Sequence, residues 1–192
     1  MAGGAALRFG GAPKGLQTIG GIRIIDRVAT ALRATTDGLM VISNDPGAAQ
    51  WLPGVLAFAD VRPERGSLVG IHSALTHAGG DVLVVAWDMP FVSAALLELL
   101  RVRRETARYA VIPEGPEGPD PFCAIYTRDC LPIIEAALDA GDLRLSRLID
   151  RLPSVERVSS REIQAIGEPA RLLFNVNTAR DLAVAEQLAR TS

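Results

Sequence analysis

The first fifteen residues combine glycines with two cations, a composition suited to binding phosphate. Ala2, Gly3 and Gly4 open the stretch, and Arg8 and Lys14 supply the positive charges. Glycines let backbone N–H groups approach phosphate oxygens closely, and cations neutralise their charge. The stretch matches neither the Walker A pattern nor the dinucleotide fingerprint. A small-residue terminus that binds nothing has the same composition, so both interpretations stand at this point.

Lys14 is the one lysine among 20 basic residues, and the other 19 are arginine. A bias toward arginine codons explains the majority without any functional argument. The exception lies in the glycine-rich stretch, where a compact ammonium differs chemically from a planar guanidinium. Composition alone does not decide between chance placement and a required phosphate contact.

Three short apolar runs, each typical of a buried parallel strand, end at a polar side chain. These side chains are Asn44, Asp60 and Asp88. In an open α/β sheet, ligands bind at the carboxyl ends of the strands. Asp88 follows the strongest run, residues 82–86, and Mg²⁺ usually takes one or two carboxylates together with substrate phosphates. We therefore expect Asp88 to bind a metal ion, although an aspartate that begins a turn before Pro90 is the simpler alternative.

Two asparagines precede the last predicted helix, in the sequence Phe174-Asn175-Val176-Asn177-Thr178. Spaced by one residue, they point to opposite faces of an extended chain, so one could face a cleft. Helix capping by Asn177 or Thr178 is the simpler interpretation. The Pro/Gly-dense residues 113–121 lie between two predicted strands, where either a substrate loop or a plain surface connection could sit.

The elements that would position these residues alternate along the chain. Helical spacing of apolar residues predicts helices over residues 22–34, 67–78, 93–104, 129–140 and 178–190. Short apolar runs predict strands over residues 39–43, 55–59, 82–86, 109–112 and 123–126. This alternation favours a Rossmann-like, three-layer α/β/α fold with a mostly parallel sheet. We find no repeat or linker, and expect a single domain over residues 1–192.

Composition limits the classes of protein that this chain can belong to. It has 192 residues, of which 48% are hydrophobic and 22% charged, so it can bury a substantial core. The net charge of −2 argues against a broad nucleic-acid footprint. Two cysteines cannot form a disulfide framework, and no apolar run approaches the ~20 residues of a membrane span. We therefore expect a cytoplasmic protein that binds neither nucleic acid nor membrane.

The order of the motifs resembles the molybdenum cofactor guanylyltransferase (MobA-type) family of the nucleotidyltransferase superfamily. The matching motifs are the glycine-rich start with Lys14, Ile42-Ser43-Asn44, Asp60 before residues 65–71, Asp88-Met89-Pro90-Phe91, and residues 174–178. They extend from Ala2 to about Leu182, nearly the whole chain. The first and fourth motifs occur widely among nucleotidyltransferases. Residues 66–70 resemble the family's Gly-Pro-Leu-Ala-Gly, with Ser67 in place of proline. Together with Asn-Val-Asn-Thr, these residues make the resemblance specific to this family within the superfamily.

The resemblance implies transfer of GMP from GTP to the molybdopterin form of the cofactor, with release of pyrophosphate. It implies that Ala2, Gly3 and Gly4 contact the nucleotide, and that Arg8 and Lys14 hold its phosphates. The acceptor's phosphate attacks the α-phosphorus directly, so no protein nucleophile is required. Positioning and charge neutralisation then account for catalysis.

The resemblance also implies roles for the later motifs. Asn44 and Asp60 would contribute to nucleotide binding, Asp88 would bind Mg²⁺, and Asn175 and Asn177 would lie near the pterin or the metal. Lys14, Arg8 and Asp88 would form the catalytic set. Other cofactor-handling proteins and molybdoenzymes are the partners that the family suggests, although no residue here identifies them.

One departure from the family concerns the first strand. The family has a hydrophobic strand directly before the glycine loop, and this strand is central in a doubly wound sheet. Here Met1 directly precedes Ala2. We expect either a start assigned too far downstream or a sheet lacking its usual first central strand. The second case would leave two strands without a neighbour.

Three functional hypotheses follow. The first is a Mg²⁺-dependent guanylyltransferase. The second is a related enzyme, either a CTP-dependent molybdopterin cytidylyltransferase or a sugar-phosphate nucleotidyltransferase, because no residue clearly reads the base. The third is a catalytically impaired nucleotide-binding protein, if the first strand is truly absent.

Overall fold

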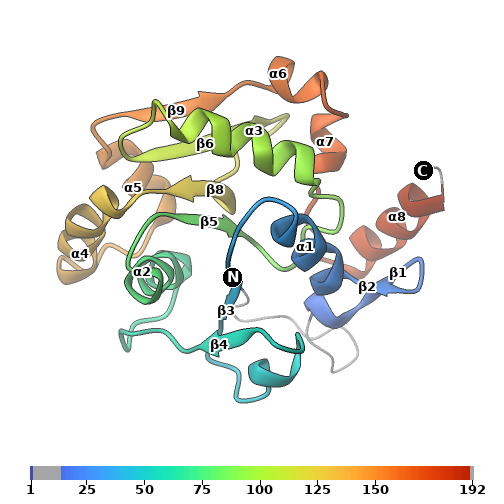
Figure 1. Ribbon diagram of the computed structural model, residues 1–192, viewed down its shortest axis with the longest axis horizontal. Helices are drawn as coiled ribbons and strands as arrows, with labels where there is room; N and C mark the ends of the chain where they lie inside the picture. The colour runs from blue at the N-terminus through green and yellow to red at the C-terminus, as the bar shows by residue number, and fades with distance from the viewer. Residues whose placement is uncertain (2–13, 191–192) are drawn as a thin grey trace.

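The chain folds into three layers, with strands in the middle and helices on both sides (Figure 1). The computed structural model describes residues 1 and 14–190. One side carries α1 (Ile24–Arg33) and α3 (Ala94–Arg104). The other side carries α2 (Ser67–Ala78), α4 (Leu131–Asp139) and α5 (Leu145–Arg151). The two main apolar clusters lie on these opposite faces, so each side of the sheet has its own core.

The strands form two larger groups. Five belong to one sheet: β5 (Val82–Val85), β8 (Cys123–Tyr126), β6 (Ala110–Gly115) and β7 (Gly118–Pro119) in that order, with β9 (Val155–Val158) paired to β6. The other group is β3 (Met40–Ile42) paired in parallel with β4 (Leu56–Phe58). β6 and β9 are also parallel, whereas β8 runs antiparallel to both β5 and β6.

The α/β class is confirmed, but the sheet is more mixed than the sequence predicts. The reason is the short connection from β6 to β8, which turns through β7. Neighbouring parallel strands need a crossover of a dozen or more residues, and this connection is too short for one. β8 therefore returns antiparallel and lies between β5 and β6 (Figure 1).

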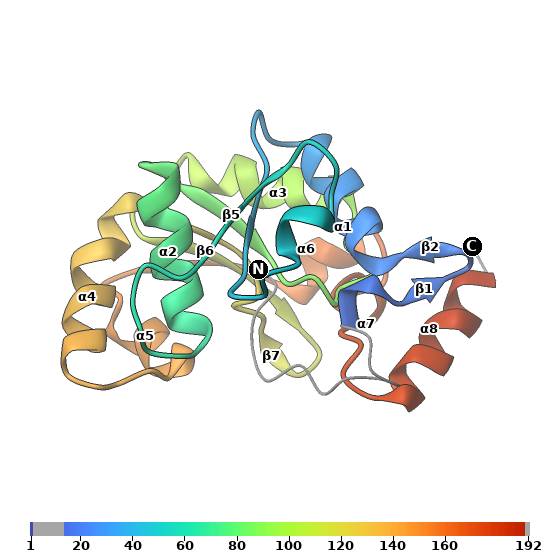
Figure 2. The same cartoon turned by 90° about the horizontal axis from the view of Figure 1, so that it is seen from below.

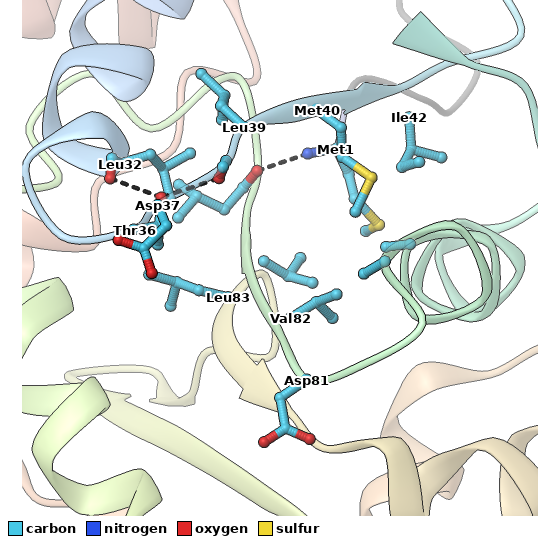
Figure 3. Close-up of a pocket in the computed structure, with 15 residues that line it drawn as sticks. Met1, Leu32, Thr36, Asp37, Leu39, Met40, Ile42, Asp81, Val82 and Leu83 are labelled. Atoms are coloured by element: carbon cyan, nitrogen blue, oxygen red, sulfur yellow. Dashed lines mark hydrogen bonds between the residues drawn. The ribbon is translucent and has the colours of Figure 1, made fainter. Parts of the chain in front are cut away.

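A cavity of about 460 Å³ separates β3 from β5 (Figure 3). Within the described part of the chain, β3 pairs only with β4 and β5 only with β8. Leu32 and Leu83 line the cavity from one core, and Met40, Ile42 and Ala74 from the other. The cavity thus occupies the space of one strand between β3 and β5, within the middle layer. Among the described residues, no strand lies between β3 and β5.

Met1 lies at one end of this cavity, between β3 and β5 (Figures 1 and 3). Its amino group donates to the Val85 carbonyl at 2.7 Å, and Trp87 N–H donates to the Met1 carbonyl at 3.1 Å. This pair of bonds is the pattern of a parallel ladder in which Met1 stands beside Ala86. Met1 therefore extends the parallel pattern at the carboxyl end of β5.

A small hairpin precedes α1. Strands β1 (Thr18–Ile19) and β2 (Ile22–Arg23) are joined by Gly20 and Gly21, which have φ of 58° and 78°. Two consecutive positive φ values define a type I′ turn, for which glycine is favoured. The hairpin lies against the last helix, α8 (Ala179–Arg190), and Gly20 N–H donates to the Glu186 carboxylate at 3.2 Å (Figure 2).

Several predicted helix boundaries are confirmed by their caps. Ser93 caps α3, where its hydroxyl accepts from Leu96 N–H. Thr178 and Asp181 exchange hydrogen bonds at the start of α8, as a capping box does. The sequence did not predict β9 or three short helices, α5, α6 (Ser160–Gln164) and α7 (Pro169–Leu172). None of the helices described is long and apolar enough to cross a bilayer.

Candidate active site

Lys14, Asp88 and the loop of residues 175–177 meet in the structure. Lys14 begins a short 3₁₀ turn, Lys14–Leu16, and its Nζ donates to the Asn177 side-chain oxygen at 3.0 Å. Val176 N–H donates to the Asp88 carbonyl at 2.9 Å. Residues far apart in the sequence, predicted from three separate motifs, are thus brought together.

Packing around two tryptophans holds Lys14 beside Asp88. Gly15 lies flat against Trp87, so closely that a Cβ on Gly15 would stand 2.5 Å from the ring. Trp87 is buried and stacks on Trp51, with ring centroids 4.9 Å apart. Because Lys14 is next to Gly15 and Asp88 is next to Trp87, this contact brings the backbones of the two site residues together. Glycine is required at position 15 by close approach, not by unusual φ.

The electrostatics of Asp88 show a carboxylate in a partly closed site. Burial raises its pKa, and its backbone hydrogen bond, the Lys14 ammonium and the Met1 amino group act in the opposite direction. A desolvated carboxylate beside cations is typical of sites that bind charged ligands. Burial also disfavours the charged form of the Met1 amino group and lowers its pKa to about 6, and the Asp88 charge partly opposes this change.

Asp120, which the sequence analysis did not single out, belongs to the same site. Burial raises its pKa, hydrogen bonds from Phe122 N–H and the Asn175 side chain oppose this, and the Asp88 charge raises it further. The two carboxylates therefore lie close enough to repel. The predicted loop of residues 113–121 contains Asp120, but nothing in its Pro/Gly composition distinguished this residue from its neighbours.

Asn44 and Asp60 form a second group, at the ends of β3 and β4. The Asn44 amide donates to the Asp60 carboxylate at 2.7 Å, and Asp60 N–H donates to the Asn44 side-chain oxygen at 2.8 Å. The Ser73 hydroxyl adds a bond to Asp60 at 3.3 Å. Parallel pairing of β3 and β4 brings them together, as expected of strand ends. No hydrogen bond or ion pair among residues 14–190 joins this group to Lys14 or Asp88.

The remaining predicted site residues, Ala2, Gly3, Gly4 and Arg8, lie outside the described residues. Of the asparagines, Asn177 is exposed and contacts Lys14, whereas Asn175 is partly buried. Asn175 donates from its amide to the Leu173 carbonyl at 3.1 Å. The two asparagines therefore divide as their spacing predicts, with Asn177 in contact with a site residue and Asn175 bonded to the backbone.

Comparisons with known proteins show which family the chain belongs to. The model of the MobA-like NTP transferase domain matches residues 1–157. Molybdenum cofactor guanylyltransferase of Desulfosudis oleivorans is 34% identical over 187 residues, covering 97% of this chain and 92% of the relative. That of Nitrobacter hamburgensis is 34% identical over 199 residues, covering 98% and 92%.

Solved structures show the same fold. Molybdopterin-guanine dinucleotide biosynthesis protein A of Archaeoglobus fulgidus superposes with a TM-score of 0.84 at 27% identity, covering 100% of this chain and 97% of that one. A 2-C-methyl-D-erythritol 4-phosphate cytidylyltransferase of Thermus thermophilus has a TM-score of 0.66 at 20% identity, covering 92% and 94%, which shows likeness of fold alone. The domain match and the two relatives place this chain in the MobA-like NTP transferase family, as a nucleotidyltransferase.

Proposed function

We propose that the protein transfers GMP from GTP to molybdopterin and releases pyrophosphate. The observation that carries this proposal is the convergence of Lys14, Asp88 and residues 175–177 on one site. The relatives at 34% identity bear the name molybdenum cofactor guanylyltransferase, and they match almost the whole chain. The proposed substrates follow from the similarity to these relatives, and the proposed chemistry follows from the side chains of the site.

The reaction needs no protein nucleophile. An oxygen of the acceptor's terminal phosphate forms a bond to the α-phosphorus of GTP, and the bond from that phosphorus to the pyrophosphate oxygen breaks. Negative charge develops on the phosphate oxygens, where a fixed cation is most effective. Lys14 supplies that cation as a point charge, and its bond to Asn177 sets its direction.

The donor set at Asp88 fits a divalent metal ion. No group of three His, Cys, Asp or Glu residues that could hold a metal occurs in the part of the chain described here. Mg²⁺, unlike Zn²⁺, does not need such a cage, because it takes one or two carboxylates and completes its shell with phosphate and water. We propose that Asp88 holds Mg²⁺. Bound there, the ion would neutralise charge on the nucleotide phosphates.

A second group of residues is proposed for nucleotide binding. Asn44 and Asp60 are fixed to each other at the ends of β3 and β4, and we propose that they form part of the nucleotide site together with Ala2, Gly3, Gly4 and Arg8. The mutual bonds of Asn44 and Asp60 hold both side chains in one orientation. Such preorganised groups lower the cost of binding.

A competition assay tests this proposal. Purified protein is given Mg²⁺, molybdopterin and equal concentrations of GTP and CTP, and pyrophosphate and both dinucleotide products are measured. We expect the guanine dinucleotide in large excess. Predominance of the cytosine product would identify a cytidylyltransferase, and binding of GTP without pyrophosphate release would support a nucleotide-binding protein that lacks activity.

A further inference from the structure

The capping box at the start of α8 carries one hydrogen bond more than a helix cap needs. Asp181 N–H donates to the Thr178 hydroxyl at 3.1 Å, and Thr178 N–H donates to the Asp181 carboxylate at 2.7 Å. These two bonds complete the box. The same carboxylate oxygen, Oδ2, also accepts from Asn177 N–H at 2.9 Å. Asn177 precedes the cap, so this third bond fixes a residue that lies outside the helix.

The capping box at α6 shows what capping alone requires. Ser159 N–H donates to the Glu162 carboxylate at 3.0 Å, and Glu162 N–H donates to the Ser159 hydroxyl at 3.4 Å. The residue before that cap, Val158, belongs to β9 and pairs with Pro113 of β6. The box at α8 adds to the same two bonds the one to Asn177, and helix capping does not account for it.

Two bonds hold the backbone of the loop ahead of α8. Val176 N–H donates to the Asp88 carbonyl at 2.9 Å. The next N–H group, of Asn177, donates to Asp181. With its backbone held in this way, Asn177 presents its side-chain oxygen to the Lys14 ammonium at 3.0 Å. The direction of the ammonium therefore depends on the backbone of Asn177, and that backbone depends on Asp181.

The segment after Lys14 is attached to α8 at a second point. The hairpin of β1 and β2 lies beside this helix (Figure 2). Gly20 N–H donates to both oxygens of the Glu186 carboxylate, at 3.2 and 3.3 Å. The chain from Lys14 to Gly20 is thus bonded to the loop before α8 at one end and to α8 itself at the other. A side chain supported by a helix is held more precisely than one supported by loops alone.

We propose that Asp181 is a positioning residue of the active site, which fixes Asn177 so that its side-chain oxygen directs the Lys14 ammonium toward the nucleotide phosphates. This inference rests on the proposed guanylyl transfer, in which Lys14 neutralises developing charge. Asp181 acts through Asn177 and needs no contact of its own with substrate. A misdirected ammonium neutralises less of the charge that develops in the transition state, so the loss of Asp181 should affect kcat.

Two variants at position 181 separate the hydrogen bonds from the rest of the side chain. Asn177 N–H and Thr178 N–H both donate to one oxygen, Oδ2. In Asp181→Asn, the amide oxygen can take that place and accept both bonds, because a carbonyl oxygen has two lone pairs. Asp181→Ala removes the acceptor of both. A positioning role therefore predicts that asparagine restores most of the activity that alanine loses.

A double-mutant cycle tests the proposal on the full chain. Steady-state kcat and KM for GTP and molybdopterin are measured for wild type, Asp181→Ala, Asp181→Asn, Asn177→Ala and the double alanine variant. We expect Asp181→Ala to lower kcat roughly tenfold, the size of a lost hydrogen bond to a charged group, with little change in KM for GTP. Asp181→Asn should stay within about threefold of wild type. The double variant should be no slower than Asn177→Ala, because a residue that acts through another gives non-additive effects.

A matched control separates positioning from helix capping. Glu162→Ala removes the corresponding carboxylate from the capping box of α6. It should lower Tm at least as much as Asp181→Ala, because Glu162 also pairs with Arg103, and leave kcat within about twofold of wild type. Should Asp181→Ala fail to fold, Asp181→Ser, whose side chain ends short of Asn177 N–H, replaces it in the same cycle.

The outcomes distinguish this role from the proposed function. Additive losses in the cycle, or a kcat for Asp181→Asn as low as that for Asp181→Ala, would overturn the positioning role and leave the proposed function standing. Equal losses of kcat in Asp181→Ala and Glu162→Ala would assign the effect to capping and also overturn the role. A wild-type protein without guanylyl transfer would overturn both.

Discussion

The Lys14 ammonium donates to the Asn177 side-chain oxygen at 3.0 Å across 163 residues of sequence. This contact joins the first described turn to the loop before the last helix. The same ammonium opposes the rise in the pKa of Asp88. One cation therefore connects the predicted phosphate-binding stretch, the predicted metal ligand and one of the two asparagines, Asn177.

Replacing Gly15 should displace Lys14 without touching any polar group of the site. In Gly15→Ala the added methyl would stand 2.5 Å from the Trp87 ring, which the stacked Trp51 prevents from moving away. We expect a loss of about 1–3 kcal/mol in stability and at least a tenfold fall in kcat, measured by denaturant unfolding and pyrophosphate release. Gly80→Ala is the control, because nothing lies within 4 Å of its Cβ position. Equal effects at both glycines would contradict the packing argument.

Asp88→Asn should abolish activity while making the fold more stable. Burial raises the pKa of Asp88, so the folded protein binds its proton more tightly than the unfolded chain. Stability therefore falls as pH rises from the ordinary aspartate pKa through the raised value, and the cost persists at neutral pH. An uncharged asparagine removes this cost, with an expected gain of about 0.5–2 kcal/mol at pH 7. A variant that is less stable than wild type at pH 7 would refute this explanation.

Stability of the chain should rise between about pH 6 and pH 8. Enclosure lowers the pKa of the Met1 amino group from 8.0 to about 6, so the unfolded state binds more protons in this window. Unfolding free energy then increases with pH, by up to about 2–3 kcal/mol across the window. Denaturant melts at half-unit pH steps measure the slope. Acetylation of the amino group removes the titration, and an unchanged slope after acetylation would assign it to other groups.

The cavity between β3 and β5 should accept a strand joined to Met1. Met1 already makes parallel-type bonds to Val85 and Trp87, so four apolar residues placed ahead of it would continue along β5. Their side chains would meet both cores, and we expect Tm to rise by about 5 °C or more. A Gly-Ser-Gly-Ser extension of equal length is the control. The same Tm for both extensions would show that the cavity is not a strand position.

Local signals in the sequence predicted the elements that depend on local chemistry. The helix over residues 67–78 has the predicted bounds, and the caps at Ser93 and Thr178 are as expected. The gap between β3 and β5 lies where the resemblance to the family places a further strand, before the glycine-rich stretch. The type I′ turn at Gly20-Gly21 had a readable signal that the helical pattern over residues 22–34 obscured.

Pairings between distant segments were not predictable from the sequence. The antiparallel return of β8 depends on the path of residues 113–121, which no periodicity describes. Asp120 gains its place only because β8 lies against β5, so its residue type carried no signal by itself. The meeting of Lys14 with Asn177 likewise follows from the complete fold, although each residue was a candidate from its own motif.

Isotope transfer tests the central claim most directly. Wild-type protein and Lys14→Ala are incubated with Mg²⁺, molybdopterin and GTP labelled at either the α- or the γ-phosphate, and label in the product is counted. We predict that α-label enters the guanine dinucleotide and γ-label leaves in pyrophosphate, with the rate about 10²–10³-fold lower in Lys14→Ala. No α-label in the product, or equal rates for both proteins, would contradict the account.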